Sequence, residues 1–200
     1  MVDVRVLVIY ESVMGNTRAI AEAVAQGAEG AGPEVTVRCR QAGRMLAEPL
    51  DADLVVVGGP THFFGLPAER TRRRWVRGVL RRGREEGLTT RLEPGAAGPG
   101  LREWFDGLDD PGAGQADCIA GVPDVRGGPR AAAFDTRLDR PMAGSAARRI
   151  ALRLRRLGYP LVARPEGFIV ENLDGPLRPG ERERAMAWGA RLVRGGPGGT

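Results

Sequence analysis

The stretch Val4-Arg5-Val6-Leu7-Val8-Ile9-Tyr10, which leads into Ser12-Val13-Met14-Gly15-Asn16-Thr17, decides the fold. Its first part is almost continuously apolar and rich in β-branched residues, as is typical of a strand buried on both faces of a parallel sheet. Residues 16–28 then place apolar side chains at helical spacing, and Gly27 and Gly30 to Gly32 are expected to mark the end of this helix. A buried strand that passes through a short loop into an amphipathic helix predicts the start of a βαβ unit.

The alternation of strands and helices continues to the end of the chain, which predicts an α/β fold with helices on both faces of the sheet. The second and the last strands carry the most polar residues, so they should form the edges of the sheet. We therefore expect a three-layer, doubly wound, parallel five-stranded sheet in the flavodoxin-like order 2-1-3-4-5. One domain should span residues 1–194, with a long insert around 66–130 and a disordered tail at 195–200. The later strands are expected at 35–39, 54–57, 131–134 and 161–170, and the later helices at 71–82, 101–108, 145–157 and 179–194.

Composition excludes several kinds of site. All thirty basic residues are arginine, so a P-loop lysine and a Schiff-base lysine are excluded. His62 is the only histidine, and Cys39 and Cys118 lie far apart, so no metal site is predicted. The net charge of +5 is consistent with an acidic partner or an anionic surface. We favour solvated arginines, and expect no nucleic-acid partner because RNA-binding signatures are lacking. No apolar run could span a membrane and no signal peptide is recognisable, so a cytoplasmic location is expected.

The loop from Ser12 to Thr17 is the first candidate site, because ligands of such sheets bind beyond the carboxyl ends of the strands. Gly15 permits a tight backbone path, and Ser12, Asn16 and Thr17 carry side-chain donors. The free N–H groups of the first helical turn and the helix dipole favour an anion at this place. A phosphate could therefore bind without a cationic side chain. The alternative is an ordinary helix N-cap made by Asn16 or Thr17.

Residues 6–21 closely resemble the opening of flavodoxin-family proteins, whose phosphate loop is typically (Ser/Thr)-x-Thr-Gly-Asn-Thr. This chain departs from that pattern at Met14, which replaces a threonine and removes one hydroxyl contact. Residues 53–62 are similar to the third strand and second flavin loop of the family. Residues 133–137 and 144–147 are similar to a bacterial subgroup. The resemblance implies FMN as cofactor, with its phosphate in the loop Ser12, Val13, Met14, Gly15, Asn16 and Thr17.

The resemblance also implies two loops around the isoalloxazine ring. His62, Phe63 or Phe64 could stack on the ring and bury a large flat surface. We expect one of the two phenylalanines to fill the core instead. In the second of these loops, Asp135 and Arg137 could form a surface ion pair, which would contribute little to stability. The first loop is Pro60, Thr61, His62, Phe63, Phe64 and Gly65, and the second is Asp135, Thr136 and Arg137.

An FMN-binding electron-transfer protein is the function that these features favour, with a redox partner protein or a small electron acceptor as its partner. The first alternative is an FMN-dependent NAD(P)H/quinone-type reductase, in which the insert around 66–130 roofs the pocket. The second is a flavodoxin-like scaffold that has lost FMN. Because the chain is basic, positive charge near the ring should favour the reduced anion. We therefore predict a second reduction potential well above the strongly negative range of typical flavodoxins.

Overall fold

The computed structural model describes residues 3–46, 50–61, 66–87, 91–109, 129–140 and 144–195. Five parallel strands form one sheet in the order β2-β1-β3-β4-β5, so the predicted topology is confirmed. The strands are β1 (Val4–Tyr10), β2 (Val35–Gln41), β3 (Leu54–Pro60), β4 (Arg130–Leu138) and β5 (Glu166–Val170). The helical segments are α1 (Asn16–Glu29), the 3-10 turn η1 (Ala42–Arg44), α2 (Glu69–Glu85), α3 (Leu101–Asp109), α5 (Ala146–Arg156) and α6 (Glu181–Val193).

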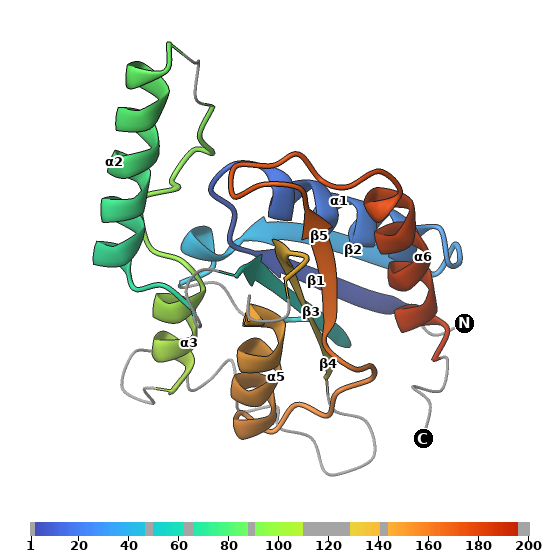
Figure 1. The fold of residues 1–200 in the computed structure, drawn as a ribbon. Helices are drawn as coiled ribbons and strands as arrows, with labels where there is room; N and C mark the ends of the chain where they lie inside the picture. The colour runs from blue at the N-terminus through green and yellow to red at the C-terminus, as the bar shows by residue number, and fades with distance from the viewer. Residues whose placement is uncertain are drawn as a thin grey trace.

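Helices cover both faces of the sheet, as Figure 1 shows. Alternate residues of the central strands point to opposite faces and enter two separate cores. One core joins the strands to α1 and α6, and an aromatic cluster of Phe134, Phe168 and Trp188 lies within it. The other core joins them to η1, α3 and α5, and both Trp104 and Phe105 are buried there. Because β1, β3 and β4 pair in parallel, their carboxyl ends lie at the same edge of the sheet.

Two glycines bring α1 and α6 into close contact. A Cβ atom on Gly27 would lie 1.9 Å from the carbonyl oxygen of Met186. A Cβ on Gly189 would lie 2.2 Å from the carbonyl oxygen of Val24. Gly27 was expected to mark the end of the first helix, but α1 continues through it to Glu29. Its function is instead to let the two helix backbones approach each other.

Further elements differ from the prediction. The strand expected at 131–134 is longer, because β4 spans Arg130–Leu138, and Asp135, Thr136 and Arg137 therefore lie in a strand and not in the expected loop. The helix expected at 71–82 is longer, because α2 spans Glu69–Glu85. The last strand is confined to Glu166–Val170, and Leu161 makes only an isolated bridge to Ala131. In Figure 1, α2 extends from the edge of the molecule, away from the sheet. None of the helices in the described ranges is long and apolar enough to cross a membrane.

Candidate functional site

The loop between β1 and α1 forms a cradle of unpaired backbone donors. Gly15 adopts φ 88°, which favours glycine, and its N–H donates to the Ser12 hydroxyl at 3.2 Å. No side chain caps α1, and the first N–H of the helix ladder that finds a partner is that of Ala19. Within the described residues, the N–H groups of Asn16, Thr17 and Arg18 have no acceptor. The expected alternative of an N-cap made by Asn16 or Thr17 is therefore wrong.

Hydrogen bonds bring the candidate segments from β3 and β4 to this loop. The hydroxyls of Thr17 and Thr136 lie 2.7 Å apart, and both side chains are buried. The carbonyl of Thr136 accepts from the N–H of Thr61 at 2.9 Å, and Pro60 pairs with Thr136 in the β3–β4 register. Three segments far apart in the sequence thus meet at one edge of the sheet. His62, Phe63, Phe64 and Gly65 lie outside the described residues.

Asp135 is a structural anchor rather than half of a surface ion pair. Its side chain is fully buried, and Oδ2 accepts from the hydroxyls of Thr61 at 3.1 Å and Ser145 at 2.7 Å and from the N–H of Ala147 at 3.0 Å. Ser145 also caps α5 by accepting from the N–H of Arg148. The carboxylate therefore ties the ends of β3 and β4 to the start of α5. Asp135 directly follows the buried apolar run 131–134, and an acid at that place was the signal for such a role.

Arg137 lies beside the same carboxylate. Its Nη1 is 3.7 Å from Asp135 Oδ1, an oxygen that has no hydrogen-bond partner among the described residues. A Cβ on Gly167 of β5 would lie only 2.5 Å from the guanidinium carbon of Arg137. Gly167 thus makes room for the arginine to lie across β5. The predicted surface pair is in fact an ion pair with one fully buried member.

Met14 occupies the position where the family pattern has threonine, and its side chain packs against α2. Val13, Val76 and Ala96 form a small apolar cluster, and Met14, Trp75 and Leu92 pack against it. The N–H of Glu93 also donates to the carbonyl of Val13 at 2.9 Å. The lost hydroxyl is therefore exchanged for apolar contact, which fixes one side of the loop to the first part of the insert.

The loop after β5 holds the other side of the cradle. The side-chain amide of Asn16 donates to the carbonyl of Asp174 at 3.3 Å. Gly175 has φ 100°, and a Cβ there would lie 2.6 Å from Asn16 Nδ2. The side chain of Asn16 is thus used for a loop contact, while its backbone N–H stays available to a ligand.

Arg72, Glu11 and Glu103 form a buried cluster of ion pairs, which we call the ion-pair knot. It fixes the insert to Glu11, the residue before the loop. Arg72 is only 2 % exposed, although it belongs to a run of arginines. Its guanidinium contacts Glu103, lies 3.6 Å from Glu11 Oε2, and donates to the carbonyls of Pro67 and Gly98. Sequence reasoning missed this role. The available signal was spacing, because Arg72 stands four and seven residues before the buried Val76 and Val79.

The two acids of the knot differ in their titration. Burial raises the pKa of Glu11, and the Arg72 guanidinium and the N–H of Leu101 oppose this only in part. Burial also acts to raise the pKa of Glu103, but the N–H of Gly100 and Arg72 outweigh it and hold that pKa below its usual value. Glu11 Oε1 is buried and unpaired among the described groups. Arg72 is therefore the cation that makes burial of the Glu11 carboxylate tolerable.

Comparison with known proteins agrees with this geometry. The flavodoxin family profile matches residues 8–98. This segment belongs to the flavodoxin family. The solved structure of a flavodoxin from the domain Archaea has a TM-score of 0.57 at 18% identity, and covers 95% of this chain and 96% of its own. Oxidised Flavodoxin 2 from Bacillus cereus has a TM-score of 0.58 at 17% identity, with 95% and 98% covered. The flavodoxin-like fold therefore extends over nearly the whole chain.

Flavodoxin-family members bind FMN, and the donor set of this loop fits the phosphate of that cofactor. The three unpaired N–H groups at the start of α1 are the donors that a helix N-terminus offers to a phosphate. One acid lies close by, because Glu93 Oε1 would be 3.1 Å from a Cβ on Gly15. It forms an ion pair with Arg18 at 3.4 Å and accepts from none of the three N–H groups. The cradle is therefore available to an anion.

Proposed function

We propose that this protein is a one-electron carrier that holds FMN with its phosphate in the loop Ser12–Thr17. The observation that carries the proposal is the row of unpaired N–H groups of Asn16, Thr17 and Arg18 behind the left-handed Gly15. The start of a helix leaves its first N–H groups without partners in the helix, so a loop that presents several of them at one point is stabilised by an anion. When bound, FMN supplies the electron-transfer chemistry.

The residues of this chain hold and orient the cofactor. The Ser12 hydroxyl fixes the Gly15 turn, and the contact between Thr17 and Thr136 holds the loop against β4. Asp135 and Thr61 fix the neighbouring strand ends, and Pro60, Thr136 and Arg137 of the predicted ring-binding set belong to these strands. Each of these contacts is made within the protein, so the site is organised before a ligand arrives. Such preorganisation lowers the cost of binding.

Gly15→Ala tests the proposal. A left-handed backbone costs a residue with a Cβ about 1–2 kcal/mol, and the new methyl group would also approach Glu93. We expect FMN affinity to fall about tenfold or more, measured by fluorescence titration of the apoprotein. Gly78→Ala in α2 is the matched control, because its Cβ would meet only the end of the Arg82 side chain at 4.0 Å. The proposal fails if the wild-type protein shows no flavin absorbance after reconstitution, or if both variants bind FMN equally well.

The reduction potential tests the carrier function. Arg18 and Arg137 lie on the two segments that we assign to the phosphate and the ring. Each is paired with an acid, but the chain carries a net charge of +5, and this positive balance should favour the reduced anion. Each tenfold preference for the reduced cofactor raises a one-electron potential by about 59 mV. We expect a redox titration to place the second potential above the strongly negative flavodoxin range. A value inside that range would refute the electrostatic reasoning. Rapid turnover of NADPH and a quinone by the isolated protein would instead favour the reductase.

A further inference from the structure

We propose that the outer face of α2 is a docking surface for an acidic protein, the electron-transfer partner of the cofactor site beside it. Five arginines, which we call the arginine stripe, carry this inference: Arg70, Arg74, Arg77, Arg81 and Arg84. All five are exposed. The role of partner rests on the proposed function, whereas the docking surface itself does not.

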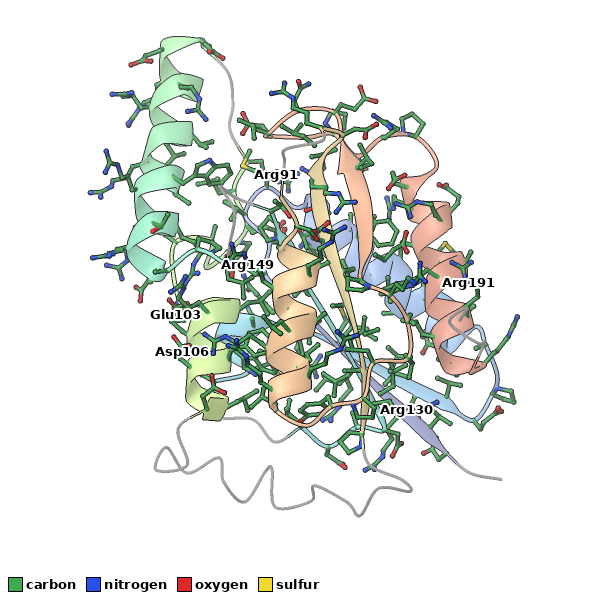
Figure 2. The ribbon with its side chains drawn as sticks, turned by 60° about the horizontal axis from the view of Figure 1, so that its bottom comes forward. Arg91, Glu103, Asp106, Arg130, Arg149 and Arg191 are labelled. Atoms are coloured by element: carbon green, nitrogen blue, oxygen red, sulfur yellow. The ribbon has the colours of Figure 1, made fainter. Side chains whose placement is uncertain are left out.

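Helix geometry places the stripe on one side of α2. The five residues follow the spacing i, i+4, i+7, i+11 and i+14, so at about 100° per residue they lie within roughly 40° of one line. Their span is about 21 Å at 1.5 Å per residue. The buried residues of the helix, Arg72, Val76, Val79 and Gly83, lie on nearly the opposite side. Nitrogen-tipped side chains project outward from α2 in Figure 2.

The stripe is poorly neutralised by the protein itself. Arg81 forms an exposed ion pair with Glu85 at 3.6 Å. Arg70, Arg74, Arg77 and Arg84 make no ion pair or hydrogen bond within the described residues. Like charges three and four residues apart on a helix repel one another and destabilise it. An acidic surface laid along the helix would relieve this repulsion.

The position of α2 connects the stripe to the cofactor site. Trp75 and Val76 belong to the cluster that packs α2 against Val13 and Met14 of the phosphate loop. The buried Arg72 further fixes the helix to Glu11, the residue before that loop. A protein bound along the stripe would therefore be separated from the loop by the width of α2, about 10 Å.

The chemistry of the stripe favours a protein over a membrane or a nucleic acid. The apolar face of α2 is covered by its own protein, and Leu80 is its only large apolar side chain found exposed in the described residues. The helix therefore lacks the free apolar face with which amphipathic helices enter a bilayer. Its one aromatic residue, Trp75, packs against the loop cluster and is not placed for stacking on bases.

The test is binding of a plant-type [2Fe–2S] ferredoxin, an acidic one-electron protein, measured by calorimetry at low and at 0.5 M salt. We expect Arg70→Gln/Arg74→Gln/Arg77→Gln to weaken binding about tenfold at low salt and to make no difference at high salt. Arg155→Gln/Arg156→Gln/Arg191→Gln is the charge-matched control on α5 and α6, and should change the affinity less than twofold. Thermal unfolding at or above the wild-type temperature would show that the stripe variant is folded.

Several results would overturn the proposal. Equal losses in both triple variants would show that net charge, and not α2, attracts the partner. Absence of ferredoxin binding to the wild-type protein, or equally tight binding of the basic protein cytochrome c, would also refute it. Tighter, stripe-dependent binding to duplex DNA or to phosphatidylserine vesicles would assign the surface to another class of partner. Calorimetry does not require flavin, so these outcomes are distinct from a failure to bind FMN.

Discussion

Arg72→Met should separate α2 from the body of the protein. The substitution keeps the length and apolar stem of the side chain but removes the cation between Glu11 and Glu103. Glu11 is 5 % exposed, and one of its carboxylate oxygens already lacks a partner among the described groups. Breaking a buried ion pair by removing one member costs about 3–5 kcal/mol. For a chain of this size, that corresponds to a fall of about 6–20 °C in Tm.

The loss should depend on pH. Without Arg72, the pKa of Glu11, which burial already raises, should rise further. The folded variant would then retain a proton that the unfolded chain releases above its ordinary pKa of 4.5. Stability of the variant should therefore fall as pH rises from about 4.5 through the raised pKa. Relative to the wild type, the deficit should be smaller at pH 5 than at pH 8.

Urea unfolding and hydrogen exchange measure this prediction together, because the amides of α2 should lose protection even if the sheet stays folded. Arg74→Met on the exposed side of the same helix is the control, and should change stability by no more than about 0.5 kcal/mol. Glu11→Gln/Arg72→Met should recover part of the loss, because it removes the unpaired charge. If Arg72→Met costs no more than Arg74→Met, and α2 remains protected, the knot does not hold the helix.

Two further predictions concern the buried Asp135 and the half-buried Cys39. Asp135→Ala should lower the free energy of unfolding, measured by urea titration, by about 3 kcal/mol or more, because three donors at the ends of β3 and α5 would lose a buried acceptor. Asp139→Ala is the control. It removes an exposed ion pair and should cost less than about 1 kcal/mol in the same titration. Burial raises the pKa of Cys39 to about 12, so about one thiol in ten thousand should be ionised at pH 8. In a Cys118→Ser variant, iodoacetamide should therefore react with Cys39 roughly a thousandfold more slowly than with an unburied thiol. A rate close to that of glutathione would contradict this burial.

The strand order could be predicted because each strand carries its burial in its own sequence. β1 and β3 are continuous apolar runs, whereas β2 alternates exposed and half-buried residues, which identifies it as an edge. The turn at Gly15 between β1 and α1 was equally readable, because it joins a buried strand to a helix, whereas phosphate binding there stays a prediction. These features are local, and local patterns are what a single sequence expresses most directly.

The remaining features depend on contacts between distant segments. Arg72 and Arg74 look alike in a basic run, but one is buried between two acids and the other is exposed. Gly27 resembled a helix stop until the backbone of α6 proved to lie against it. Asp135 was expected at the surface, because the sequence does not reveal that its carboxylate contacts two hydroxyl groups and the start of α5. In each case the burial is decided by an element far along the chain.

The close contact between α1 and α6 has a consequence for how the protein is made. The helix α1, which follows the loop Ser12–Thr17, is synthesised well before α6, whose backbone packs against Gly27. Until residues 181–193 have been added, the apolar side of α1 that includes Val24 lacks part of its cover. The growing chain therefore cannot complete the support of this loop before α6 has formed. We expect a cofactor held by the loop to be loaded only after α6 has been synthesised.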